Sequence, residues 1–117
     1  MPRIIKCRRI CAEPLNTIFL SQDPERSFIT LSVDELESLR LCDLEGLDQE
    51  DAAQQMDISR GTLQRILYSA RKHVAEALTN GSGIVIEGGQ YKIANEHCNC
   101  ADKCKKCEYK KENEEEK

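Results

Sequence analysis

Apolar residues recur every three or four positions through the middle of the chain, which is the pattern of amphipathic helices. The clearest repeat predicts a helix from Arg60 to about Leu78, with Ser59 placed to cap its first turn and the segment Asn80-Gly81-Ser82-Gly83 to end it. Its expected inward stripe consists of Leu63, Ile66, Leu67, Ala70, Val74, Ala77 and Leu78.

An earlier helix is predicted between Ser32 and Gly46. Ser32, with Glu35 three residues later, forms the reciprocal capping-box pattern of a helix start. Glycine supplies the left-handed residue that ends a helix, so Gly46 marks the stop. The apolar positions at helical spacing are Leu36, Leu39 and Leu44, flanked by Val33 and Cys42. We therefore expect the acids of this segment on its outer face.

Residues 49–68 have the spacing of a helix-turn-helix. Asp48 caps a short helix from Gln49 to Met56, and Asp57 occupies the turn before helix 60–78. The small side chain of Ala53 lets the two helices approach closely, and the turn sets the angle between them. The outer face of the second helix can then enter a DNA major groove.

Short β-strands are predicted on both sides of the helices. β-branched residues favour strands within Arg3–Ile10, Thr17–Leu20 and Ser27–Leu31, and residues 84–87 and 90–93 around Gly88-Gly89 predict a hairpin. The expected fold class is mostly α, with short strands at the N-terminus and a C-terminal β-hairpin. The expected division is a basic arm over 1–31, a helix-turn-helix domain over 32–80, the hairpin over 81–94, and a tail over 95–117 that is Cys-rich and then Lys/Glu-rich.

Charge is segregated along the 117 residues, although the net charge is only −4. Residues 1–11 carry four basic groups and no acid, residues 12–57 carry twelve acids and two basic groups, and residues 58–78 carry four basic groups and one acid. A basic helix beside an acidic segment gives a local field that can steer a polyanion. No apolar run reaches membrane-span length and no secretory signal precedes the arm, which predicts a soluble, cytoplasmic protein.

The polar positions of helix 60–78 suit DNA recognition. Arginine can bridge two guanine acceptors, glutamine can pair with adenine, and helix-end amides beside Ser59 favour a phosphate. A polar helix face is also typical of a merely solvated helix, and the charge contrast favours DNA. The candidate DNA contacts are Ser59, Arg60, Thr62, Gln64, Arg65, Tyr68, Arg71 and Lys72 on this helix, and Arg3, Lys6, Arg8 and Arg9 on the arm.

Four cysteines near the C-terminus form a candidate metal site, in the pattern C-x-C-x3-C-x2-C. These are Cys98, Cys100, Cys104 and Cys107. Four thiolates can close a tetrahedral zinc site or hold an iron–sulfur cluster, and an unliganded reduced tail is the alternative. His97 or the pair Cys7 and Cys11 could complete such a site, but that pair is more typical of buried thiols. Cys42 is expected in the core, and His73 on the surface without a catalytic role.

The residues from Asp48 to Leu63, followed by Ala70-Arg71-Lys72, resemble the helix-turn-helix of sigma factor region four. Further segments resemble a prokaryotic family of small predicted DNA-binding proteins, catalogued as domain of unknown function 134, over about residues 1–90: Met1-Pro2-Arg3, Lys6-Cys7-Arg8-Arg9, Leu36 to Leu41, Asp43 to Leu47 and Ile86 to Gly89. The resemblance implies a transcriptional role without an established target. Asp57 stands where relatives usually have Gly, and Asp tolerates the left-handed turn.

No motif for an enzyme is present: the chain has no Walker loop, no G-x-G-x-x-G and no H-E-x-x-H. The sequence therefore predicts a non-enzymatic transcriptional regulator that binds double-stranded DNA, as a homodimer, with a metal-binding or redox-sensing tail. Two alternatives remain. The first is a sigma-like module that binds RNA polymerase through the acidic helix, and the second is a metal or redox carrier.

Overall fold

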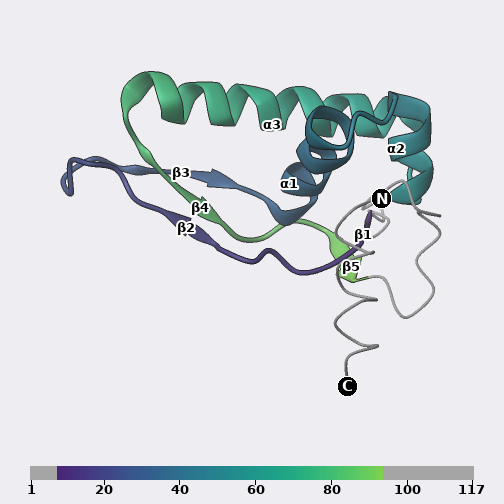
Figure 1. Cartoon of the computed structure of the whole chain (residues 1–117), viewed down its shortest axis with the longest axis horizontal. Helices are drawn as coiled ribbons and strands as arrows, with labels where there is room; N and C mark the ends of the chain where they lie inside the picture. Colours follow the sequence, from purple (N-terminus) through teal and green to yellow (C-terminus); the bar gives the residue numbers. More distant parts are fainter. Residues whose placement is uncertain (1–7, 94–117) are drawn as a thin grey trace, which may run out of the picture.

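The computed structural model describes residues 8–93, and its secondary structure is mostly helical. Within that range the elements are, in chain order, β1 (Arg8–Ile10), β2 (Ile18–Phe19), β3 (Phe28–Leu31), α1 (Val33–Leu39), the π-helix η1 (Arg40–Leu44), α2 (Gln49–Gln55), α3 (Arg60–Asn80), β4 (Gly83–Ile86) and β5 (Tyr91–Ile93). Helix α3 runs along one side of the molecule, with β3, β4 and β2 beneath its C-terminal half and α1 and α2 at its other end (Figure 1). No helix in residues 8–93 is both long and apolar enough to cross a membrane.

The three predicted helix starts are confirmed by their caps. The Ser32 hydroxyl accepts the Glu35 N–H while the Glu35 carboxylate accepts the Ser32 N–H, which is the full capping box. Asp48 caps α2, and Ser59 caps α3 by accepting the Thr62 N–H at 3.2 Å. The left-handed positions are also where the sequence places them: Gly46 has φ +78°, Asp57 +58° and Gly81 +69°.

The first predicted helix is not regular to its end. After Leu39 it widens into η1, in which the Glu45 N–H donates to the Arg40 carbonyl, five residues back, at 2.8 Å. A π-turn contains more residues than an α-turn, so the residues that follow it point to a different side of the helix than regular α-helical spacing predicts. Leu44, expected inward, is accordingly 76% exposed.

The acids of α1 do not form an outer face, which corrects the expectation from the sequence. Asp34, Glu35 and Glu37 are all buried. Helix α1 packs against α3 on one side and β1 on the other, so it has little surface left for water. Each carboxylate instead has a polar neighbour, and the strongest contact is the bidentate pair between Glu37 and Arg40, at 2.8 Å for both bonds.

The predicted C-terminal hairpin is wrong, although both of its strands exist. Strand β4 pairs antiparallel with β2 and parallel with β3, whereas β5 pairs parallel with β1. Gly88 and Gly89, both with positive φ, carry the chain from one sheet to the other. The observed pairing places Leu31 opposite Ile86 and buries both in the core, a gain that an isolated hairpin would lack.

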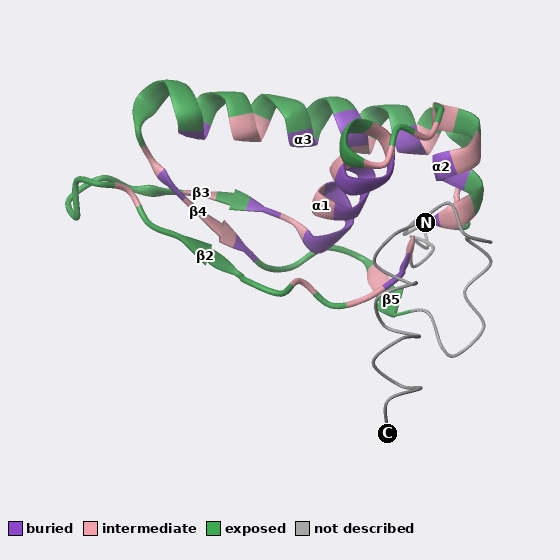
Figure 2. Cartoon of the chain, viewed as in Figure 1, coloured by how far each residue is buried: buried purple, intermediate pink, exposed green. Residues whose placement is uncertain are grey.

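Two apolar clusters hold the helices in place (Figure 2). One lies between α3 and the sheet, and its buried members are Ile10, Leu31, Val33, Ala70 and Ile86. The other lies between η1, α2 and the start of α3, and its buried members are Leu41, Ala52, Ala53, Met56 and Leu63. Leu78, expected on the inward stripe, is 75% exposed because it lies about 100° around the helix from buried Ala77.

Candidate nucleic-acid interface

The outward face of α3 carries most of the candidate DNA contacts that the sequence assigns to this helix. Leu63, Leu67 and Ala70 are completely buried on the opposite side, which fixes the rotation of the helix about its axis. The residues left exposed are Ser59, Arg60, Gln64, Arg65, Tyr68, Arg71 and Lys72, while Thr62 is half-buried. The expected set is therefore brought together along the first three turns of one rigid helix.

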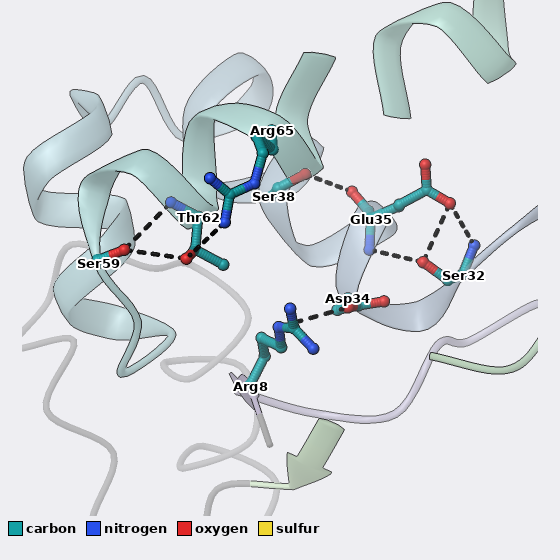
Figure 3. A network of polar contacts seen from close by, with 8 residues as sticks. All are labelled: Arg8, Ser32, Asp34, Glu35, Ser38, Ser59, Thr62 and Arg65. Atoms are coloured by element: carbon teal, nitrogen blue, oxygen red, sulfur yellow. Dashed lines mark hydrogen bonds and ion pairs between the residues drawn. The ribbon is translucent and has the colours of Figure 1, made fainter. Parts of the chain in front are cut away.

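Three of these residues form a hydrogen-bonded ridge at the start of α3 (Figure 3). The Ser59 hydroxyl lies 2.9 Å from the Thr62 hydroxyl, and an Arg65 amino group donates to Thr62 Oγ1 at 3.3 Å. This contact holds the exposed guanidinium of Arg65 in one direction above the first turn. Beside it, a Cβ added at Gly61 would meet nothing within 4 Å, so the helix backbone there is open to close approach.

A second ridge runs along the side of α3 that faces η1. The Gln64 amide donates to the Tyr68 hydroxyl at 3.2 Å, and the guanidinium of Arg71 lies 5.9 Å from the Tyr68 ring centre. Arg71 also makes two hydrogen bonds to Asp43, at 2.8 and 3.1 Å. These bonds lower the pKa of Asp43 and raise that of Arg71, so the pair stays ionised near neutral pH.

The Arg71–Asp43 pair was not foreseen from the sequence, because 28 residues separate its members. Both side chains are nearly half exposed. An incoming phosphate would compete with Asp43 for Arg71, which weakens Arg71 as a contact relative to Arg65.

Strand β1, from the predicted basic arm, lies beside the turn between α2 and α3 but offers less free charge than expected. The Arg9 N–H donates to the Met56 carbonyl at 2.8 Å, which fixes β1 at the turn between α2 and α3. The Arg8 side chain is only 17% exposed, and its Nε lies 3.9 Å from Asp34 (Figure 3). Arg3 and Lys6 lie outside the described residues.

The candidate metal ligands Cys98, Cys100, Cys104 and Cys107 also lie outside the described residues, as does Cys7. Within 8–93 no three potential ligands cluster. Cys11 is buried, and Cys42 is half-buried against the cluster around Leu41, as expected for core thiols. Burial raises the pKa of Cys42, which keeps its thiol protonated and unreactive at neutral pH.

A polar cluster joins α1 to α3 beneath the candidate interface. Glu35 Oε2 lies 2.8 Å from both the Ser69 hydroxyl and His73 Nδ1. His73, for which the sequence suggested no partner, is therefore tied to a buried carboxylate. Burial raises the pKa of Glu35, but the hydrogen bonds from Ser32, Ser69 and His73 together outweigh it, and the net pKa is lowered.

Glu35→Gln is expected to cost about 1–3 kcal/mol of stability at pH 7, because the amide cannot accept all of these bonds. A carboxyl with a lowered pKa stabilises the fold above its unfolded-state pKa and loses that effect as pH falls. The difference in unfolding free energy between wild type and variant should therefore shrink below about pH 4.5. Urea unfolding at pH 7 and pH 3.5 measures this, with exposed Glu13→Gln as the control. A difference that stays constant with pH would contradict it.

Comparison with known proteins finds one matching family and several similar bacterial proteins. A family described as "Protein of unknown function DUF134" matches residues 1–94. A UPF0251 protein of Caldicellulosiruptor bescii is 48% identical over 92% of this chain and 74% of its own length. Others from Clostridium novyi (49% identical, 92% and 73%) and Thermoanaerobacter pseudethanolicus (48%, 82% and 84%) are similar to it as well. No solved structure matches the chain.

Proposed function

This chain belongs to the family of proteins of unknown function DUF134, and we propose that it is a sequence-specific double-stranded DNA-binding protein acting in transcription. The observation that carries the proposal is the α2–turn–α3 unit: a small Ala53 buried at the helix contact, a left-handed Asp57 turn, and a capped α3 with a polar, basic outer face. These features support a helix-turn-helix that would lay its second helix in a major groove. The likeness to sigma factor region four belongs to this proposal.

Within the interface, roles follow from where each side chain lies. Gln64 and Arg65 project from the second turn of α3, the part that reaches deepest in such complexes, and both can pair with base edges. Arg60 and Lys72 lie nearer the two ends of the exposed face and suit phosphates. Arg71 would exchange Asp43 for a phosphate on binding.

The cysteine-rich segment is proposed as a metal-binding tail attached to this DNA-binding unit. The chemistry of its donors, four thiols within ten residues, suits zinc or an iron–sulfur cluster. Metal and sulfide analysis of the full chain purified without oxygen tests this assignment, with Cys104→Ser as the comparison. Loss of metal with intact helices supports a separate sensor, whereas a metal-free wild type refutes it.

The alternative role as a polymerase-binding module is less well supported. It required an acidic outer face on the first predicted helix, and three of the five acids there, Asp34, Glu35 and Glu37, are buried. The charge of these three is not available at the surface for a basic partner, and exposed Asp43 is paired with Arg71.

Arg65→Ala is expected to weaken binding to the preferred sequence by about 1–3 kcal/mol while changing binding to other sequences little, because a base contact is lost. Lys72→Ala should instead weaken all sequences alike and reduce the salt slope by about one. A selection from genomic fragments supplies the preferred sequence, and titrations at several salt concentrations supply the affinities.

The matched control is Arg26→Ala, an exposed arginine in the loop between β2 and β3, far along the chain from α3. It removes the same charge and should leave both sequence preference and affinity nearly unchanged. If Arg65→Ala weakens every sequence equally, Arg65 is a phosphate contact and its role as a base reader is wrong. If wild type selects no sequence, the proposed function is wrong.

A further inference from the structure

The sheet β2–β4–β3 leaves large apolar side chains in water. Leu31 and Ile86 face α3 and are buried with Ala70. By the alternation of side chains along a strand, Ile18 and Phe28 belong to the opposite face, and they are 52% and 47% exposed. Beside β2, Leu15 and Leu20 are 89% and 80% exposed, and the whole of β2 is exposed in Figure 2.

These four residues, which we call the β2 patch (Leu15, Ile18, Leu20 and Phe28), lie close together. Strand β4 lies between the β2 residues and Phe28 on β3, because Ile18 pairs with Val85 and Phe28 with Gly83. A Cβ at Gly83 would lie 2.7 Å from the Phe28 ring and 2.8 Å from the Phe19 carbonyl, so the ring lies across the glycine beside β2. With a large apolar residue exposing about 200 Å², the patch amounts to roughly 500–600 Å².

That area approaches the roughly 800 Å² that each partner contributes to a standard interface. The patch is also free of charge. The three longest uncharged runs of the sequence are 14–22, 27–33 and 77–86, and the structure brings all three into this one sheet and the adjoining end of α3. Although each copy has a net charge of −4, two copies that meet here would place no like charges of the patch directly against each other.

The chain's own remaining C-terminal sequence is a poor cover for this patch. Residues 94–117 contain a single large apolar side chain outside the cysteines, Tyr109, among thirteen Lys, Asp and Glu residues. A DNA backbone is equally unsuited to an uncharged apolar surface. From these observations we propose that the β2 patch is where a second copy of this chain binds, forming a symmetric dimer.

The contact would form through side chains rather than by joining strand edges. The Ile86 N–H donates to the Thr17 carbonyl, so Ile18 directs its own backbone groups away from β4. The Ile18 carbonyl already accepts the Asn16 side-chain amide at 2.8 Å, which blocks that edge for another strand. A two-fold axis through the patch would bury the same residues on both copies.

Sedimentation of the full chain without DNA, from about 1 to 100 µM and under reducing conditions, tests the dimer. Wild type should sediment at twice the chain mass of 13.3 kDa. The variant Ile18→Asp/Leu20→Asp should raise the dissociation constant at least about 30-fold, because charges would be buried at the interface. Leu44→Asp, an equally exposed leucine on η1, is the matched control and should remain a dimer.

Circular dichroism confirms that each variant is folded, and if the double variant is not, Leu15→Asp alone replaces it, since Leu15 is in no strand and 89% exposed. A monomeric wild type, or patch variants that still dimerise, would overturn the proposal. This test needs no DNA, so its failure is separate from failure of the proposed function. If the proposed function also holds, the dimer should bind a palindromic DNA site whose half-sites lie one or more helical turns apart.

Discussion

Replacing Arg40 with methionine is expected to destabilise the protein by about 3–5 kcal/mol, the usual cost of leaving one member of a buried ion pair alone. The Arg40 and Glu37 side chains are 6% and 5% exposed and share two hydrogen bonds of 2.8 Å. Methionine has similar length but no charge, so the Glu37 carboxylate would stay buried without its cation. Urea unfolding followed by circular dichroism measures the loss.

The double variant Glu37→Met/Arg40→Met separates loss of the pair from loss of one partner. Removing both charges avoids the unpaired carboxylate but leaves the Cys11 N–H, which donates to Glu37 Oε2 at 2.9 Å, without its acceptor. The double variant should therefore lose only about 1–3 kcal/mol, less than the single variant. A double variant as unstable as the single one would show that shape, and not charge, explains the cost.

The Glu37–Arg40 pair also explains why the sequence predicted where the helices begin but not that the acids of the first helix are buried. Caps are local signals, so Ser32, Asp48 and Ser59 indicated the helix starts correctly. Whether Glu37 faces water depends on the end of β1, because the N–H of Cys11, which directly follows that strand and precedes Glu37 by 26 residues, donates to the Glu37 carboxylate. A charge pattern cannot show that a strand covers that face, and the acids of α1 were consequently expected outside.

Strand partners were missed for the same reason. The predicted strands 84–87 and 90–93 are found within one residue of those bounds, as 83–86 and 91–93, and Gly88-Gly89 is a sound turn signal. The partner of β4, however, is decided by which strand buries Ile86, and that strand is β3, more than fifty residues earlier. The short spacing in the sequence favours pairing β4 with β5, whereas the burial of Ile86 against Leu31 requires pairing β4 with the distant β3.

The candidate interface was more predictable because it lies on one helix. Periodicity alone separates Leu63 and Leu67, which are buried, from Gln64 and Arg65, which are exposed. Contacts that cross between elements could not be predicted in this way. The Arg71–Asp43 pair and the anchoring of Arg8 at Asp34 are the two examples that bear on the proposed DNA interface.

Leu63→Ala is expected to cost about 2–5 kcal/mol, because the side chain is completely buried and its removal opens a cavity. Leu63 fills the space between η1, α2 and α3, in contact with the cluster of Leu41, Ala52, Ala53 and Met56. A cavity there would also loosen the angle between α2 and α3, so sequence-specific DNA affinity should fall even under conditions where the variant is folded. Chemical unfolding measures the first effect, and titration with the preferred DNA measures the second.

Two variants make this prediction discriminating. Leu63→Met nearly conserves volume and should cost less than about 1.5 kcal/mol. Leu44→Ala removes the same atoms from a leucine that periodicity alone places inward, yet the π-turn of η1 leaves that leucine 76% exposed, and its loss should stay within about 0.5 kcal/mol. If Leu44→Ala proved as costly as Leu63→Ala, the first helix would be regular to its end, and the wide turn that brings Asp43 to Arg71 would be wrong.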